Sequence, residues 1–222
     1  MNTDNVYPFV KEIFDNMCNS YQRIFDNPDF LPTNDKDNNR ATGFTERNLT
    51  FNFCHSYLEL NEKGVIWQEM PIIGQSHQHI DSVIVHSDTL LLIEAKRLHS
   101  PYHFEELTSS HFEELISSHF EELTSKPSLK KPRQHRTNPY GDLYRLQTYY
   151  KDIPIFDKQK YKACYAILLA DFLIQRSNNK KTVNDTYHLF YKKYFDDQEY
   201  KVFDNDKMEY YLYYKVVPII TK

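Results

Sequence analysis

Three charged residues, Asp81, Glu94 and Lys96, have the types and the spacing that a metal-dependent hydrolytic site requires. They lie in the segment 79–97, where two stretches rich in β-branched and apolar residues flank the turn-forming pair Ser87-Asp88. A hairpin centred on that turn places Asp81 directly opposite Glu94, with their Cβ atoms about 4.5–5.5 Å apart. Lys96 follows Glu94 by two residues, so it lies on the same face of the strand, opposite His79.

The surroundings of these residues favour a metal site over an ordinary surface hairpin. Two facing carboxylates repel each other unless a cation lies between them. The apolar run Leu90–Ile93 directly before Glu94 is typical of a strand that is buried on both faces. Charged groups at the end of such a strand are costly unless they are paired or bound to metal. A surface carboxylate pair with a solvated lysine is the alternative.

The predicted ligands are hard oxygen donors without a thiolate, a set that suits Mg²⁺ or Mn²⁺. Such a cation polarises a phosphoryl oxygen and lowers the pKa of a bound water. Lys96, pointing into the same space, orients that water or stabilises the negative charge that develops on phosphorus. The three residues therefore predict phosphodiester hydrolysis.

The segment His77-Gln-His79-Ile-Asp81 offers a different metal site. His-x-His-x-Asp resembles the start of the zinc site of metallo-β-lactamase-like hydrolases. Those proteins usually continue with another histidine and a glycine-rich turn into a helix, whereas Ser82-Val-Ile-Val85 continues a strand. The other histidines lack the spacing of zinc ligands, so a zinc hydrolase is the less favoured alternative.

Apolar periodicity predicts the elements around the hairpin. Residues 1–27 form a helix, and a second helix begins near Thr45, carries Glu46 in its first turn and runs to about residue 60. A strand at 64–70 and the two hairpin strands follow, and Glu69 on the first strand is expected to pair with a basic side chain. The remaining elements are helices at 140–150 and 187–195 and strands at 161–170 and 210–217. This order predicts an α/β fold with a mixed sheet.

Asp81 followed by Glu94-Ala-Lys96 across a hairpin, after a helix bearing Glu46, resembles the PD-(D/E)xK nuclease superfamily, which comprises restriction-endonuclease-like and RecB-like nucleases. The resemblance covers residues 45–170. It implies a restriction-endonuclease-like core, made of a helix, a three-stranded meander, a helix and a strand. It also implies that Asp81, Glu94 and Glu46 bind Mg²⁺ or Mn²⁺ and that Lys96 is the catalytic lysine.

Other positions match the family in part. Gln147 is similar to a catalytic glutamine of the RecB-like members, but Lys151 stands where those members carry a tyrosine. Ile80 precedes Asp81 in place of the proline in the superfamily's name. An acidic residue such as Glu46 in a first helical turn is also favourable with the helix dipole alone.

The composition indicates a globular protein. The chain has 222 residues, of which 40% are hydrophobic and 15% aromatic, enough to bury a core and to argue against wholesale disorder. We expect a single nuclease-like domain over 1–222, with a helical N-terminal extension at 1–44 and an insertion at 103–137. Three widely spaced cysteines fit a reducing compartment. Neither a signal peptide nor an apolar run of membrane-spanning length is recognisable, so a cytoplasmic location and no membrane partner are expected.

The predicted insertion has two parts. Three nearly identical eight-residue units, each beginning His-Phe-Glu-Glu-Leu, occupy residues 103–126. Eight helical steps overshoot two turns by about 80°, so a continuous helix would keep no face apolar. We expect a tolerated surface insertion, with an adjustable partner-binding arm as the alternative. The basic, proline-containing loop 126–136 is either a solvated linker or a nucleic-acid contact. The candidate contact residues are Lys126, Lys130, Lys131, Arg133, Arg136 and, on the following helix, Arg145.

Taken together, these residues predict a Mg²⁺-dependent deoxyribonuclease, with DNA favoured over RNA. The formal net charge of −4 does not by itself indicate nucleic-acid binding, so the prediction rests on the hairpin. Cutting both strands of a duplex often requires two copies of a site, and a homodimer is one expected assembly. The alternative is a non-catalytic module that keeps the nuclease fold and works through contact with a partner.

Overall fold

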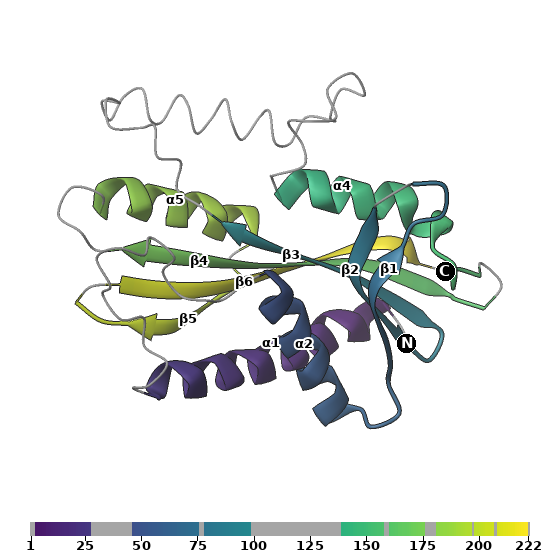
Figure 1. Cartoon of the computed structure of the whole chain (residues 1–222), viewed down its shortest axis with the longest axis horizontal. Coiled ribbons are helices and arrows are strands. Elements are labelled where there is room, and N and C mark those ends of the chain that lie inside the picture. The colour runs from purple at the N-terminus through teal and green to yellow at the C-terminus, as the bar shows by residue number, and fades with distance from the viewer. Residues whose placement is uncertain are drawn as a thin grey trace, which may run out of the picture.

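The computed structural model describes residues 3–27, 46–75, 78–98, 139–157, 160–175, 181–196, 198–206 and 208–221. Within these ranges the chain forms a six-stranded mixed sheet with helices on both faces (Figure 1). Helices α1 (Thr3–Asp26) and α2 (Glu46–Leu60) lie below the sheet in that view. Helices α4 (Pro139–Tyr149) and α5 (Lys181–Tyr194) lie above it. The predicted α/β class is confirmed.

The strand order is β1-β2-β3-β4-β6-β5. The bounds of the strands are Val65–Pro71 for β1, His79–His86 for β2, Thr89–Leu98 for β3, Ala163–Gln175 for β4, Glu199–Asp204 for β5 and Met208–Thr221 for β6. Strands β3 and β4 pair in parallel and the other neighbours are antiparallel, so the sheet is mixed as predicted. Because a parallel pair needs a crossover connection, α4 lies between these two strands in the chain and over the sheet in space.

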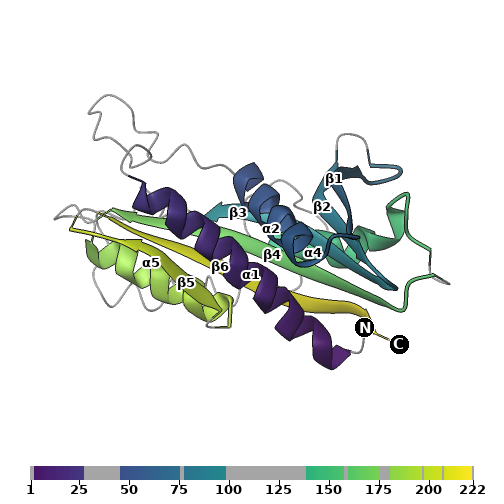
Figure 2. The same cartoon turned by 90° about the horizontal axis from the view of Figure 1, so that it is seen from below.

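Strand β3 is the centre of the molecule and is buried on both faces, as its apolar run predicts. Leu91 and Ile93 face the layer of α1 and α2, which Figure 2 shows crossing the strands. Leu90 and Leu92 face the opposite way and pack with Leu143 of α4 and its apolar neighbours. By strand alternation, Glu94 and Lys96 then point toward α4.

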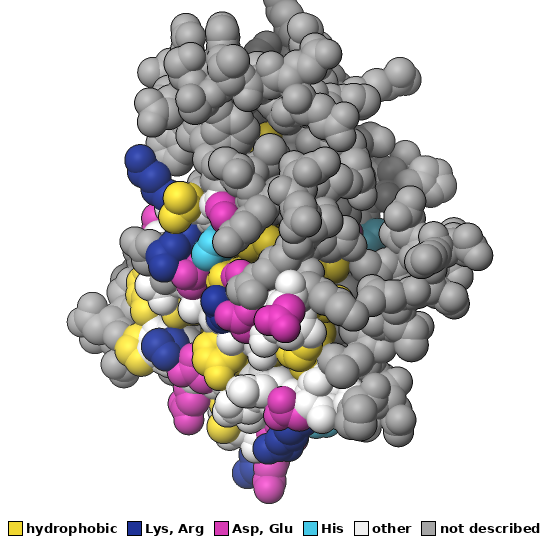
Figure 3. All heavy atoms as spheres, turned by 90° about the vertical axis from the view of Figure 1, so that its left-hand side faces the viewer, with side chains coloured by type: hydrophobic (Ala, Val, Ile, Leu, Met, Phe, Trp, Pro, Cys, Tyr) yellow, Lys and Arg dark blue, Asp and Glu magenta, His cyan; other side chains and the backbone are white. Residues whose placement is uncertain are grey.

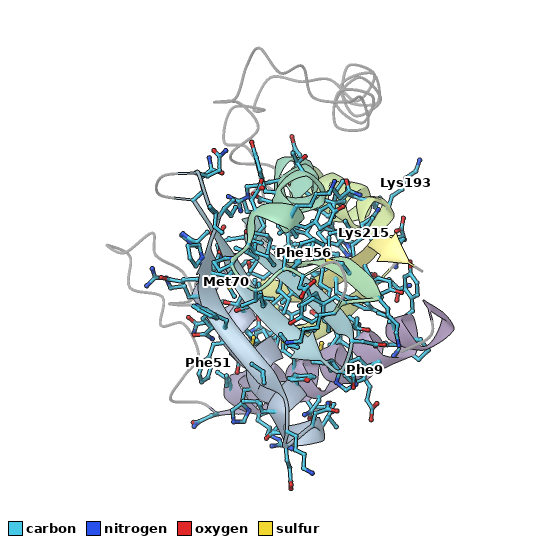
Figure 4. All side chains as sticks on the ribbon, turned by 90° about the vertical axis from the view of Figure 1, so that its right-hand side faces the viewer. Phe9, Phe51, Met70, Phe156, Lys193 and Lys215 are labelled. Atoms are coloured by element: carbon cyan, nitrogen blue, oxygen red, sulfur yellow. The ribbon has the colours of Figure 1, made fainter. Side chains whose placement is uncertain are left out.

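Separate apolar clusters cover the two faces of the sheet. Phe9 of α1 packs against the first cluster, which includes Leu91 and Ile93. Phe156, just after the short 3₁₀ helix Tyr150–Asp152, packs against the second cluster, which includes Leu90 and Leu92 (Figure 4). Met70 of β1 also belongs to the second cluster. The side of the sheet that carries Glu94 and Lys96 is therefore the side that α4 covers.

The hairpin turns at Ser87 and Asp88, and Ser87 has a left-handed φ of 55°. Val83 pairs with Leu92 and His86 with Thr89, which is the predicted register. The β2–β3 ladder runs from His86–Thr89 to Ser82–Ile93 and ends there. The register prediction is therefore confirmed for the ladder, and it stops one step before Asp81 and Glu94.

Some bounds differ from the predictions. The strand Glu199–Asp204 was not predicted, because its charged residues mask the alternation of a short edge strand. Strand β4 continues to Gln175, and α5 begins at Lys181 rather than at residue 187. The repeats at 103–126 and the rest of the insertion up to 137 lie outside the described residues. None of the helices in the described ranges is both long and apolar enough to cross a membrane.

Candidate functional site

The candidate site begins where β2 separates from β3. Figure 1 shows β1 and β2 steeply inclined to β4 and β6, and the ladder between β2 and β3 ends at Ser82 and Ile93. The backbone N–H of Ala95 donates a hydrogen bond to Asp81 Oδ2 at 2.9 Å. The N–H of Arg97 donates to Glu46 Oε1 at 3.0 Å. Two predicted carboxylates thus accept the N–H groups that a continuing strand would have accepted.

The backbone at Asp81 is irregular on its other side too. The β1–β2 ladder keeps one register from Gln68–Ser82 to Met70–Ile80 but skips the pair Glu69–Asp81, and Glu69 has a left-handed φ of 53°. Glu69 Oε1 lies 3.1 Å from Arg47 Nη2. This ion pair confirms that Glu69 has a basic partner.

Glu94 is the most deeply buried carboxylate of the site, with 3% of its side chain exposed. Its Oε2 lies 2.6 Å from Arg145 Nη2 of α4. Its Oε1 is buried and has no hydrogen-bond partner among the described residues. Burial and, next, the charge of Asp81 raise the pKa of Glu94 well above its ordinary value, although Arg145 opposes this shift.

Lys96 lies between two carboxylates. Its Nζ is 3.1 Å from Asp142 Oδ2 and 4.0 Å from Glu46 Oε1. Burial is the largest single influence on the pKa of Lys96 and lowers it, but the nearby carboxylates, led by Asp142 and then Glu46, together leave the pKa raised. The expected pairing of Lys96 across the hairpin with His79 is not formed, because the ladder has already ended. His79 Nε2 lies 3.9 Å from Asp81 Oδ1 instead.

Asp142 of α4 belongs to the site, although no sequence motif points to it. It is buried, and besides Lys96 it faces Arg145, whose Nη2 lies 3.5 Å from its Oδ1. Burial raises the pKa of Asp142, and the charges of Lys96 and Arg145 oppose the increase. Its sequence context hid this role, because an aspartate after Pro139 in a first helical turn is expected from the helix dipole alone.

The ion pair between Arg97 and Asp171 supports the site from the neighbouring strand β4. Arg97 donates its backbone N–H to Glu46, and its Nη2 lies 2.8 Å from Asp171 Oδ2. Arg97 Nε also donates to Asp171 Oδ2, at 3.3 Å, and the Tyr210 hydroxyl donates to the same oxygen. This bidentate contact fixes the position of β3 next to Glu46.

The charges of the cluster do not balance when all its groups are ionised. Two cations, Lys96 and Arg145, face four carboxylates, which leaves two negative charges in excess. The carboxylates are Glu46, Asp81, Glu94 and Asp142. Within the described ranges, no three His, Cys, Asp or Glu side chains gather closely enough to hold a metal ion. The cluster instead offers the carboxylates of Asp81 and Glu94, and Oε1 of Glu94 has no partner among the described residues.

Two further predicted residues, Gln147 and Arg145, lie where their predicted roles do not place them. Gln147 is exposed on α4, two positions after Arg145 and therefore about 200° around the helix from it, so it is not brought to the cluster. Arg145, expected as a nucleic-acid contact, points its guanidinium at Glu94. His77 of the zinc alternative and the loop residues Lys126, Lys130, Lys131, Arg133 and Arg136 lie outside the described residues. On the described part of the face in Figure 3, acidic and basic side chains are interspersed rather than separated by sign.

Comparison with known proteins leaves the family of this chain open. No protein-family model matches the sequence, and neither the curated proteins nor the solved structures contain a significant match.

Proposed function

We propose that this protein is a divalent-metal-dependent nuclease that hydrolyses phosphodiester bonds in DNA. Asp81 and Glu94 bind the cation, Glu46 assists at the solvent side, and Lys96 acts at the reacting phosphate. The observation that carries the proposal is Oε1 of Glu94, which is buried without a partner among the described residues, in a cluster where the charges of Asp81 and Lys96 also act. The resemblance of the sequence motif Asp81 followed by Glu94-Ala-Lys96 to the PD-(D/E)xK nucleases supports the same conclusion.

The residues fit Mg²⁺ or Mn²⁺. Mg²⁺ is usually held by one or two carboxylates together with waters and substrate phosphates, so a third protein ligand is not required. Glu94 is costly to ionise where it lies, and a cation beside it would remove that cost. When bound, the cation polarises a phosphoryl oxygen and lowers the pKa of a water.

The chain's own groups supply the rest of the chemistry. Asp142 and Glu46 hold the Lys96 ammonium from two sides and keep it charged. A fixed positive charge stabilises the negative charge that develops on the phosphoryl oxygens in the transition state. Phosphate backbone contacts are assigned to the basic loop 126–136. A homodimer, with one site per strand, is the assembly proposed for cutting duplex DNA.

A second candidate function is a non-catalytic binding module. One observation favours it, because Glu94 and Lys96 already have partners of opposite charge in Arg145 and Asp142. A cluster that is paired internally is able to serve as a structural element of the fold alone. Such a module has no reason to bind a divalent cation at Glu94.

The two candidates are separated by a cleavage assay on the full chain. Supercoiled plasmid, linear duplex DNA, single-stranded DNA and RNA are incubated with Mg²⁺, Mn²⁺ or EDTA. The nuclease proposal predicts cleavage that EDTA abolishes and that Asp81→Asn and Lys96→Ala each lower by about a hundredfold or more. Lys162→Ala is the matched control, since Lys162 is exposed and pairs with Asp88 at the tip of the hairpin. Cleavage that both site variants retain in full would refute the proposal.

A further inference from the structure

The guanidinium of Arg145 contacts the Glu94 carboxylate, which in the proposed function binds a divalent metal ion. We propose that Arg145 is the resident counter-ion of Glu94 and that a divalent cation binds this carboxylate by replacing the guanidinium. The inference rests on the proposed metal site, and it assigns to Arg145 a role in controlling when that site is filled. Arg145 is therefore a positioning residue in this proposal.

The contact is close but incompletely formed. Arg145 Nη2 lies 2.6 Å from Glu94 Oε2, and the same nitrogen lies 3.5 Å from Asp142 Oδ1. The Nε atom of Arg145 is buried and has no hydrogen-bond partner among the described residues, and neither has Oε1 of Glu94. The guanidinium therefore meets Glu94 through one nitrogen and one oxygen, without the two parallel hydrogen bonds of a strong arginine–carboxylate pair.

The pair between Arg97 and Asp171 shows what a permanent contact looks like in the same chain. There, Nη2 and Nε both donate to the carboxylate, and the hydroxyl of Tyr210 adds a third hydrogen bond. Among the described residues, the Arg145–Glu94 pair has neither a second arginine nitrogen nor a hydroxyl donating to the carboxylate. Arg145 is also the more exposed of the two site cations, with 29% of its side chain exposed against 17% for Lys96.

Charge repulsion makes binding of the Arg145 guanidinium and of a divalent cation to Glu94 mutually exclusive. Glu94 needs a positive neighbour because it is buried beside Asp81 and Asp142. A divalent cation held by Asp81 and Glu94 would meet that need more fully than Arg145, since it carries two positive charges. With the cation in place, a guanidinium against the same carboxylate would be repelled. Arg145 therefore weakens cation binding by the free energy of its own contact.

The test measures Mn²⁺ binding to the full chain by calorimetric titration, without substrate and without reference to activity. Arg145→Gln is compared with wild type and with Arg23→Gln, which removes an exposed arginine in the last turn of α1. The inference predicts that Arg145→Gln binds Mn²⁺ about tenfold more tightly or better, as expected for removing a contact between charged groups. Arg23→Gln is expected to bind as wild type does.

Equal or weaker binding by Arg145→Gln, with clear binding by wild type, overturns this inference and leaves the proposed function intact. No Mn²⁺ binding by any of the three proteins overturns both. Arg145→Gln leaves Glu94 without its counter-charge and could destabilise the fold. The thermal unfolding of this variant is therefore also measured with and without Mn²⁺. If it fails to fold alone, the inference predicts that Mn²⁺ restores a cooperative transition, and failure of Mn²⁺ to restore it counts against the inference.

Discussion

Asp81 Oδ2 accepts a hydrogen bond of 2.9 Å from the backbone N–H of Ala95, just past the last pair of the β2–β3 ladder. The carboxylate therefore takes the place of a strand carbonyl, and its charge acts on Glu94. One side chain serves both the fold and the proposed chemistry. The two roles make different demands on it, since the fold needs an acceptor and the chemistry needs a negative charge.

Substitutions at Asp81 are expected to separate these roles. Asp81→Asn keeps an acceptor for Ala95 and should cost little stability, whereas Asp81→Leu leaves the N–H without a partner and should cost about 1–3 kcal/mol. Both variants should lose cleavage activity, because neither carries the charge. Urea unfolding followed by the cleavage assay measures the two effects. Equal stability losses in both variants would show that the hydrogen bond is not what holds the strand end.

The raised pKa of Glu94 predicts a pH-dependent stability in the absence of divalent cations. Burial and then Asp81 raise this pKa, so the folded state binds more protons than the unfolded state above the ordinary glutamate pKa of 4.5. Stability is therefore expected to fall as the pH rises from 4.5 toward the raised pKa. Glu94→Gln removes this dependence, so it should gain stability relative to wild type as the pH rises.

Urea unfolding across that range checks the prediction, with Glu62→Gln as a control on an exposed glutamate. Glu94→Gln also leaves Arg145 without its charged partner, which changes the free energy of unfolding by a further amount. That amount does not vary with pH, because arginine stays charged throughout. Parallel stability curves for wild type and Glu94→Gln would mean that folding does not raise the pKa of Glu94.

Much of this arrangement was predictable from local sequence. The turn at Ser87-Asp88 and the alternation of β2 and β3 specify the register, and that register is observed. The apolar run before Glu94 correctly indicates a strand buried on both faces. These features depend on neighbouring residues, whose side-chain alternation fixes which face each residue occupies.

Contacts that depend on distant elements were not predictable in this way. The ladder ends early because β2 diverges from β3, and alternation alone carries no information about that divergence. Asp142 and Arg145 reach the site through a crossover helix more than 40 residues away from Glu94 in the chain. The family resemblance implies a catalytic role for Gln147, but its position around α4 turns it away from the cluster.

Asp142 is expected to act by holding Lys96 in place. Asp142→Asn removes the charge that lies 3.1 Å from Lys96 Nζ while keeping the size of the side chain. We expect kcat to fall by about tenfold to a hundredfold with a smaller change in KM, because a mispositioned lysine stabilises the transition state less. Steady-state kinetics on the cleaved DNA measure both constants. The same change at exposed Asp152, just after α4, is the control. A rise in KM alone would indicate a role in substrate binding instead.

The repeats at 103–126 are expected to be dispensable. Their near-identity and eight-residue period suit an insertion that the fold tolerates, since no face of a continuous helix would stay apolar. A chain in which residues 103–126 are deleted should keep the thermal midpoint and the cleavage activity of wild type. Loss of activity or of a bound partner in this deletion would favour the partner-binding arm.

Diffraction from crystals of the full chain soaked in Mn²⁺ tests the central claim most directly, because it does not require the substrate to be known. The claim predicts an anomalous peak about 2.0–2.2 Å from one oxygen of Asp81 and one of Glu94, with Arg145 displaced from Glu94. An empty position between the two carboxylates at saturating Mn²⁺, with Arg145 still against Glu94, would contradict it.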